Sequence, residues 1–269
     1  MYIIVNPIGG LGNRMRVISS ALSYARELNK KVIILWFKTK DLNCSYNKLF
    51  KKNKNFKVIS INEPNSKIPF LNKIISTISK VIINNFLKKS YYFEDNIQES
   101  IKQLISGNRS IRKNIFIKTC HQFHPVNDYS IFIPIDKIQK KIKNIVKRFN
   151  DYTIGIHIRR TDNEISKLHT STEKIIQLLD DEIKLDPGVK FFLATDSLEE
   201  EKYLLQKYSD RIIIQENKTL SRDSQKGIED ALVDLYCLSK TKKVYGSYWS
   251  SFTDTTAKLN PKLELIIVK

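Results

Sequence analysis

The strongest constraint on the fold is a regular alternation of short apolar runs with longer amphipathic stretches. The chain opens with an apolar run over residues 2–5, a glycine turn, an amphipathic stretch to about residue 29 and a second apolar run over 32–37. Parallel strands need a crossover between them, so this order predicts a β-α-β unit. The alternation returns in the second half, and we therefore expect an α/β fold with mostly parallel sheets wrapped by helices.

The second half of the chain carries the more regular pattern. After a less regular stretch around residues 120–129, a basic helix is predicted at about 135–149, and this is the expected domain boundary. Helices are expected to start near Ser171, Leu198, Gly227 and Ser251, close to Ser, Thr or Asp residues that could cap them. The apolar runs predicted to be strands cover 153–158, 190–194, 211–214, 243–245 and 263–268.

Composition is that of a folded protein in a reducing compartment. The 269 residues correspond to about two domains, and 41% hydrophobic with 28% charged residues excludes disordered, collagenous and multi-spanning chains. The cysteines, Cys44, Cys120 and Cys237, form no C-x-x-C pair and predict neither a disulfide framework nor a Cys-rich zinc site. Because the N-terminus lacks the features of a signal peptide, we expect a cytoplasmic protein.

A formal net charge of +18 favours an anionic partner. Nucleic acid is the less favoured partner, because the lysines are scattered and no basic and aromatic binding module is present. Residues 68–87 have apolar residues at helical spacing with lysines between them, which predicts a core-facing helix with a basic side or a helix that meets a membrane surface. The second interpretation would place the protein peripherally on an anionic inner membrane face, through Lys67, Lys73, Lys80, Lys88 and Lys89.

The glycine turn Gly9-Gly10-Leu11-Gly12-Asn13-Arg14 follows the first strand and opens a helix. Small residues in this position let a phosphate approach backbone N–H groups at the positive end of the helix, and they also suit a tight structural turn. The turn matches neither G-x-G-x-x-G nor the Walker lysine pattern, so the ordinary dinucleotide and ATPase interpretations are weakened.

A second motif places His157, Arg159, Arg160 and Asp162 at the C-terminal end of a hydrophobic strand. Ligands of open α/β sheets bind at such ends. Because side chains alternate along a strand, His157 and Arg159 should share one face while Arg160 points elsewhere. An arginine here could neutralise a departing diphosphate, or it could form a buried ion pair with Asp162.

Three further segments carry polar groups near strand ends or on one helical face. Asp196 ends an apolar strand, where it could meet a ligand or cap the next helix. Asp230 and Asp234 share a helical face and would repel each other unless a ligand donor or a basic side chain meets them. Ser250 and Ser251 lead from a strand into a helix and form either a second anion site or a simple cap.

These segments, in this order along the chain, resemble the fucosyltransferase superfamily of bacterial nodulation α-1,6-fucosyltransferases, animal core α-1,6 enzymes and protein O-fucosyltransferases. The resemblance implies a GT-B fold, with two facing Rossmann-like domains: 1–130 on the acceptor side and 131–269 binding the nucleotide sugar. The matching segments are Gly9-Gly10-Leu11-Gly12-Asn13-Arg14, His157-Ile158-Arg159-Arg160-Thr161-Asp162, Phe192-Leu193-Ala194-Thr195-Asp196, the Asp234 helix and Ser250-Ser251-Phe252.

The resemblance also implies transfer of fucose from GDP-fucose, with inversion and without a metal, to a glycan or lipid-linked glycan acceptor in surface polysaccharide synthesis. The absence of an Asp-x-Asp pattern agrees with a reaction that needs no metal cofactor. An α-1,2 linkage or a different nucleotide sugar remains an alternative. The expected catalytic residues are Arg159, which matches the residue at the β-phosphate, and Asp162 or Glu164 as the base. The expected donor-binding residues are Gly9, Gly10, Gly12, Asn13, His157, Arg160, Asp196, Asp234, Ser250 and Ser251.

Overall fold

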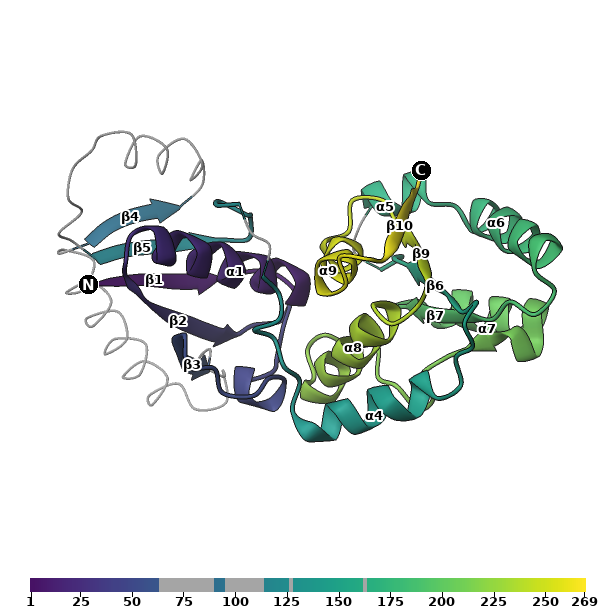
Figure 1. Ribbon diagram of the computed structural model, residues 1–269, viewed down its shortest axis with the longest axis horizontal. Helices are drawn as coiled ribbons and strands as arrows, with labels where there is room; N and C mark the ends of the chain where they lie inside the picture. Colours follow the sequence, from purple (N-terminus) through teal and green to yellow (C-terminus); the bar gives the residue numbers. More distant parts are fainter. Residues whose placement is uncertain (63–89, 95–113, 126–127, 162–163) are drawn as a thin grey trace. The chain divides into compact units, whose positions relative to one another are not determined.

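The computed structural model describes residues 1–62, 90–94, 114–125, 128–161 and 164–269. The chain divides into two units, Met1–Ile133 and Pro134–Lys269, and in the described residues each unit is built on one five-stranded sheet (Figure 1). Every strand pair in both sheets is parallel. This confirms the predicted α/β class, whereas the helix predicted at 68–87 lies outside the described residues.

The sheet of the N-terminal unit has the strand order β3-β2-β1-β5-β4. Helix α1 (Leu11–Glu27) crosses from β1 to β2 and buries Met15, Ile18 and Leu22 along one side, at the spacing of an amphipathic helix. The β-α-β unit predicted at the start of the chain is therefore present. The strands are β1 (Tyr2–Pro7), β2 (Lys31–Lys38), β3 (Phe56–Asn62), β4 (Ser90–Glu94) and β5 (Asn114–Thr119).

The sheet of the C-terminal unit has the order β10-β9-β6-β7-β8, so its first strand is central. Its strands are β6 (Ile154–Ile158), β7 (Phe191–Thr195), β8 (Ile212–Ile213), β9 (Lys243–Ser247) and β10 (Glu264–Val268). The helices are α4 (Asp136–Val146), α5 (Glu164–His169), α6 (Thr172–Leu185), α7 (Leu198–Tyr208), α8 (Gln225–Leu238) and α9 (Ser251–Leu259). Between β8 and β9 the chain crosses to the other side of β6.

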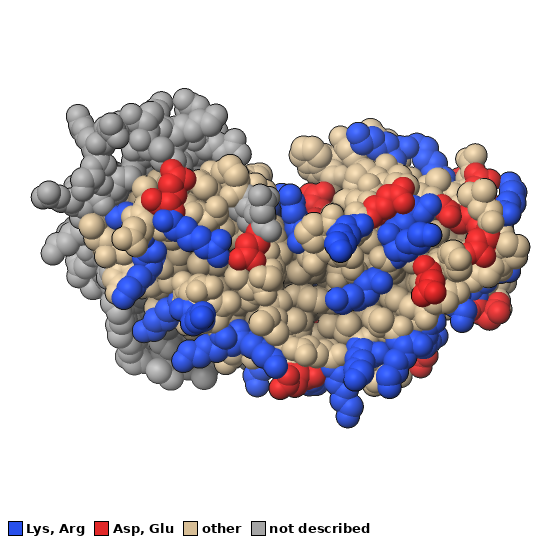
Figure 2. Space-filling model, in the orientation of Figure 1, with Lys and Arg blue, Asp and Glu red and all other residues tan. Residues whose placement is uncertain are grey.

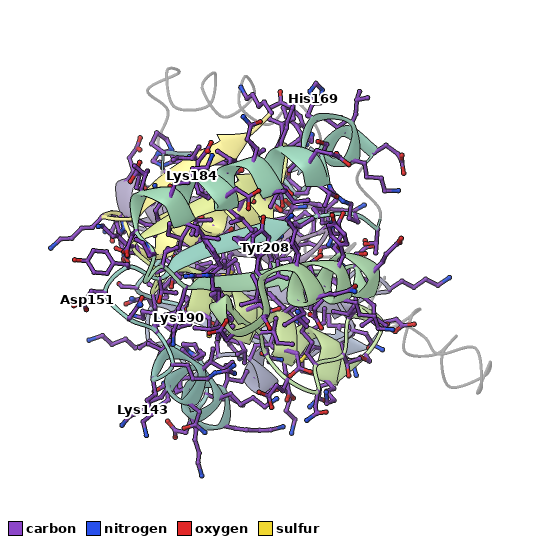
Figure 3. All side chains as sticks on the ribbon, turned by 90° about the vertical axis from the view of Figure 1, so that its right-hand side faces the viewer. Lys143, Asp151, His169, Lys184, Lys190 and Tyr208 are labelled. Carbon is purple, nitrogen blue, oxygen red and sulfur yellow. The ribbon has the colours of Figure 1, made fainter. Side chains whose placement is uncertain are left out.

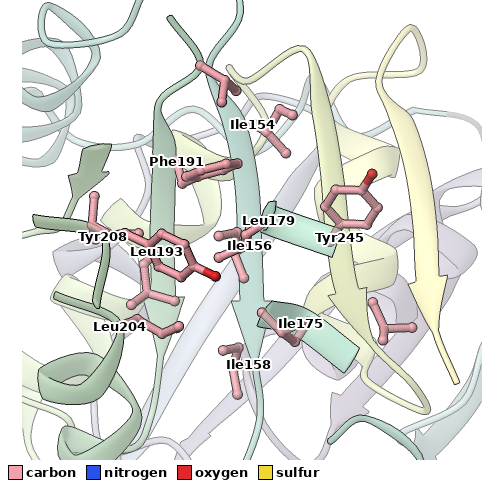
Figure 4. Close-up of a cluster of buried hydrophobic side chains, with 13 residues drawn as sticks. Ile154, Ile156, Ile158, Ile175, Leu179, Phe191, Leu193, Leu204, Tyr208 and Tyr245 are labelled. Atoms are coloured by element: carbon pink, nitrogen blue, oxygen red, sulfur yellow. The ribbon is translucent and has the colours of Figure 1, made fainter. Parts of the chain in front are cut away.

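One face of β6 builds the main core of this unit. Ile154, Ile156 and Ile158 pack in one cluster with side chains of α6 and α7, among them Leu179 and Leu204 (Figure 4). Full burial of each such side chain contributes about 1.5–3 kcal/mol. Because strand side chains alternate, Gly155 and His157 face the opposite side, toward the ends of α8 and α9.

Helix α4 has one buried, apolar side and one side that carries lysines. Ile138, Ile142 and Ile145 are buried, at the expected helical spacing. Lysine side chains cover its outer side, where blue atoms gather in Figure 2. Two of them meet acids of α8: Lys137 lies 2.9 Å from Glu229 and Lys141 lies 2.8 Å from Asp230.

Gly246 of β9 is required by the close approach of α9. A Cβ atom at this position would lie 2.2 Å from Cγ2 of Thr253, which is far inside van der Waals contact. We therefore expect Gly246→Ala to lower the free energy of unfolding by roughly 1–3 kcal/mol, the usual effect of overpacking. Urea unfolding would measure this loss.

A second substitution tests the cause. Thr253→Ser deletes the clashing methyl but keeps the hydroxyl, so the double variant Gly246→Ala/Thr253→Ser should recover part of the stability. Strictly additive losses in the two variants would contradict this explanation.

Candidate active site

The carboxyl ends of β6 and β9 form the point where the strand order of the C-terminal sheet reverses. Open α/β sheets bind ligands in the crevice outside such a switch point, because the following loops diverge there. The loop after β6 carries Arg159 and Arg160, and the loop after β9 leads into α9. Figure 3 labels residues at both ends of these strands. Asp151 and Lys190 lie just before β6 and β7, at the amino ends, whereas His169 ends α5, the helix that follows the carboxyl end of β6.

Asp196, at the carboxyl end of β7, organises the loop after β6. One carboxylate oxygen accepts the Arg160 backbone N–H at 2.7 Å, and the other accepts the Thr161 hydroxyl at 2.7 Å and lies 2.8 Å from the Arg159 guanidinium. Burial opposes ionisation of this group, but Arg159 and these hydrogen bonds outweigh it and hold the pKa of Asp196 below its usual value. The following helix is capped by Ser197 instead.

The two arginines point to different surroundings, as strand alternation predicts. Arg160 donates to Glu200 at 2.6 Å, to the Thr170 carbonyl at 2.6 Å and to the Thr172 hydroxyl at 3.1 Å. Its guanidinium is therefore engaged within the domain. Arg159 lies against Asp196 with 11% of its side chain exposed, and its backbone N–H donates to the Ser247 hydroxyl at 2.9 Å. The ion pairs of both arginines thus use Asp196 and Glu200, while Asp162 lies outside the described residues.

His157 is a buried, neutral imidazole. Its Nδ1 shares a 2.6 Å hydrogen bond with the Thr253 hydroxyl, and its ring stacks on Phe252 with centroids 4.9 Å apart. Burial lowers the pKa of His157 to about 3, and the nearby Arg159 contributes in the same direction against the opposing effect of Asp196. His157 is therefore suited to hydrogen bonding and packing, not to carrying charge near neutral pH.

The beginning of α9 leaves its first-turn N–H groups without a side-chain cap. The N-cap residue Ser250 makes no capping hydrogen bond, whereas Ser171, Ser197 and Ser224 cap α6, α7 and α8. Uncapped N–H groups at a helix start attract anions through the helix dipole. Ser247 ties this loop to β6, because its hydroxyl donates to the His157 carbonyl at 3.0 Å.

The glycine loop after β1 has the same property. Gly10 is the N-cap of α1 and offers no side chain, and no acid lies in the first turn. Gly9 has φ of +79°, a conformation that favours glycine. Arg14 is fully buried and ties the loop to the residue after β2, because its guanidinium donates to the Gly9 carbonyl at 2.8 Å and to the Thr39 hydroxyl at 2.9 Å. Asn13 lies beside Gly9 and accepts from Arg16.

Asp234 lies in a buried charged cluster on α8. The Lys218 ammonium lies 2.7 Å from Glu201 and 3.5 Å from Asp234. Burial raises the pKa of Asp234 to about 6, although the positive charge of Lys218 acts against this shift. Within the described structure, Oδ1 of Asp234 has no hydrogen-bond partner. Asp230 instead meets Lys141 and Lys226 at 2.8 and 2.9 Å, which resolves the repulsion expected from the sequence.

Glu164, one of the expected bases, is the first residue of α5. Its side chain is 83% exposed and lies 2.7 Å from Lys167. The described residues hold no group of three His, Cys, Asp or Glu side chains able to bind a metal ion. Among those same residues, no helix is long and apolar enough to cross a membrane. A cavity of about 510 Å³ lies at the opposite, amino edge of the sheet and is lined by Tyr152, Glu182 and Lys243, among others.

Sequence reasoning did not identify several residues that shape this site. Ser247 and Thr253 flank the segment of Ser250 and Ser251, but nothing in the sequence marked them as the partners of Arg159 and His157. Glu200 and Lys218 were missed because their partners are distant in sequence. The available signal was local: Glu200 follows Ser197, the N-cap residue of α7, by three residues, which places it in the first turn of the helix.

Structural comparison identifies the fold. NodZ alpha-1,6-fucosyltransferase soaked with GDP-fucose matches with a TM-score of 0.68 and 17% identity, over 97% of this chain and 92% of that one. A FUT1 mutant from Arabidopsis thaliana in complex with GDP matches with a TM-score of 0.62 and 16% identity, over 99% and 69% of the two chains. POFUT1 in complex with GDP matches with a TM-score of 0.61 and 11% identity, over 98% of this chain and 97% of that one.

No protein-family model and no curated protein matches the chain. The fold class is nevertheless defined by the solved structures: the chain has the α/β fold of GT-B fucosyltransferases, as expected from its sequence.

The unusual pKa of Asp234 predicts a pH-dependent stability difference. The folded carboxyl takes up a proton near pH 6 but the unfolded one only near 3.8, so its contribution to stability falls as pH rises between these values. Relative to wild type, Asp234→Asn should gain roughly 3 kcal/mol between about pH 4 and 7. Urea unfolding across this range would measure it.

The matched control lies one turn earlier on the same helix. The pKa of Asp230 is lowered, because Lys141 and Lys226 outweigh burial, so its carboxylate stabilises the fold above about pH 4. Asp230→Asn should therefore lose stability relative to wild type as pH rises. Equal pH profiles for the two variants would contradict the assignment.

Proposed function

We propose that this protein is an inverting glycosyltransferase that moves fucose from GDP-fucose to a glycan acceptor and needs no metal ion. The observation that carries the proposal is Arg159, held by Asp196 at the switch point of the C-terminal sheet beside the uncapped start of α9. The fold is that of fucosyltransferases solved with GDP-fucose or GDP. In this proposal, residues 1–130 face the acceptor and residues 131–269 bind the donor.

The chemistry asks the protein to stabilise charge on a leaving diphosphate. Arg159 supplies a permanently charged, planar donor, and the first-turn N–H groups of α9 with Ser250 and Ser251 supply further donors. Together they take the place of a divalent cation. The buried acceptor Asp234 and neutral His157 are assigned to the guanine side, while Gly9, Gly10, Gly12 and Asn13 are assigned to a second phosphate-suitable helix start.

Arg160 and Asp196 have a different part in this proposal from the direct donor contact expected of them. Their charged groups are bound to Glu200 and to Arg159, respectively. We assign them to holding Arg159 in place.

A nucleotide panel tests the proposal. GDP should raise the melting temperature of the full chain more than UDP, CMP or ADP, and the protein should hydrolyse or transfer the sugar of GDP-fucose with a chelator present. Preference for another nucleotide would indicate a different donor, and loss of transfer in the chelator restored by manganese would refute metal independence. Linkage analysis of the product separates α-1,6 from α-1,2 transfer.

Arg159 is expected to matter more for turnover than for folding. Arg159→Ala should lower kcat by about a hundredfold, equivalent to roughly 3 kcal/mol of transition-state stabilisation. Asp196 keeps its bonds from Arg160 and Thr161, so the fold should survive. Arg159→Lys should be nearly as slow if the contact is bidentate. Arg148, an exposed arginine paired with Glu216, provides the control: Arg148→Ala should leave kcat unchanged.

Asp162 and Glu164 are proposed as candidates for the base that accepts the proton of the acceptor hydroxyl. Asp162→Asn and Glu164→Gln separate the roles, because loss of a base lowers transfer while donor affinity stays constant. Loss of both properties would indicate an acid that orients the arginines. Normal transfer by both variants would exclude both residues.

We further propose that the protein acts in the cytoplasm on a surface-polysaccharide or lipid-linked acceptor and meets an anionic membrane face through Lys67, Lys73, Lys80, Lys88 and Lys89. Each lysine near such a surface contributes about 1 kcal/mol. Co-sedimentation with anionic vesicles should be reversed by salt and weakened by glutamine at these positions. Equal binding to neutral vesicles at low salt would refute the membrane contact.

A further inference from the structure

Trp249 is an exposed aromatic residue in a strained backbone conformation. Its φ is +55°, in the left-handed region that bulky side chains rarely adopt, and 68% of the residue is exposed. A glycine would adopt this backbone without strain, and a polar side chain would suit the exposure better. The combination of backbone strain and exposure directs attention to a ligand.

The position of Trp249 is the second observation. It lies between Ser247, which binds the Arg159 backbone, and Ser250, the N-cap of α9. The indole is thus carried by the same loop that borders the proposed diphosphate site, at the carboxyl edge of the sheet. The exposed aromatic Tyr152 lies before β6, at the amino edge.

The neighbouring residue fixes the loop in place. The Tyr248 ring lies 6.1 Å from the Trp249 ring, packs edge-on against His169 at 4.9 Å and has the Lys269 ammonium 5.1 Å from its centroid. The Tyr248 backbone N–H also donates to Thr170 at 3.0 Å. Trp249 therefore extends from an anchored aromatic neighbour into solvent.

We propose that Trp249 is a stacking platform for a sugar ring of the acceptor. The electron-rich face of an indole attracts the C–H face of a pyranose, and its flat area covers one ring. The donor nucleotide is the less suitable occupant, because the groups assigned to guanine, His157 and Asp234, are buried, whereas Trp249 is exposed. This inference rests on the proposed function and adds an acceptor-binding residue to it.

Fluorescence can report this contact directly, because the chain has only two tryptophans and Trp36 is fully buried. Acrylamide quenching of the full chain with bound GDP should therefore report Trp249. Neutral trisaccharides of glucose, galactose, mannose and N-acetylglucosamine serve as probes. At least one should reduce the quenching constant about twofold, as expected when a bound ring covers one face of the indole.

Variants separate a sugar platform from a donor contact. Trp249→Ala should raise the KM or Kd for the binding trisaccharide by about tenfold and leave GDP affinity unchanged, whereas Trp249→Phe should keep most of the affinity. Tyr152→Ala removes an exposed ring at the other edge and should change neither. Trp249→Gly should raise Tm, because it relieves the positive φ, while it abolishes shielding.

Three outcomes overturn the inference. They are a parallel loss of GDP affinity in Trp249→Ala, failure of every probe to shield the indole, and a Trp249→Gly variant less stable than wild type. Failure of the proposed function looks different, since wild-type protein would then not respond to GDP at all.

Discussion

The carboxylate of Asp196 is the interaction on which the candidate site depends. It lies at the end of β7, yet it fixes the loop after the neighbouring strand β6 by accepting from two successive residues and pairing with Arg159. Taking a carboxylate out of water is costly unless hydrogen bonds compensate it, and Asp196 accepts from the Arg160 N–H and the Thr161 hydroxyl beside its ion pair with Arg159. The ionised state of Asp196 and the position of Arg159 therefore depend on each other, because Arg159 favours the carboxylate and the carboxylate holds Arg159 in place.

The close packing of α9 on β9 also shapes the surroundings of Arg159. Gly246 lets α9 approach β9, which brings the Thr253 hydroxyl to His157. His157 then stays neutral beside Arg159, so it adds no second positive charge to the site. On the other face of β6, the isoleucines pack against α6 and α7. Arg160, just after β6, forms an ion pair with Glu200 of α7. One short strand thus supplies both the packing and the polar groups.

Much of this organisation could be predicted from the sequence, because the features are local. The central strands β6, β7 and β9 are apolar runs, the serines before α6 and α7 are adjacent to the helices they cap, and alternation separates Arg159 from Arg160. The edge strands β3 and β4 and the strand β5 were not predicted: Lys57 and Ser60 interrupt the apolar pattern of β3, Lys118 interrupts that of β5, and β4 has only five residues with a polar residue at each end. The partners of the charged groups were also out of reach: Glu200 is forty residues from Arg160, and only the fold brings them together.

The helices of this protein differ in how their first N–H groups are satisfied. A serine of the chain already occupies this position at α6, α7 and α8, so an incoming anion there would have to displace a protein hydrogen bond. At α1 and α9 the N-cap residue makes no side-chain hydrogen bond to the first turn. An anion that bound there would displace no N-cap hydrogen bond on entering, and none would have to re-form when it left. Binding or release of an anion at these two helix starts would therefore need no rearrangement of an N-cap hydrogen bond.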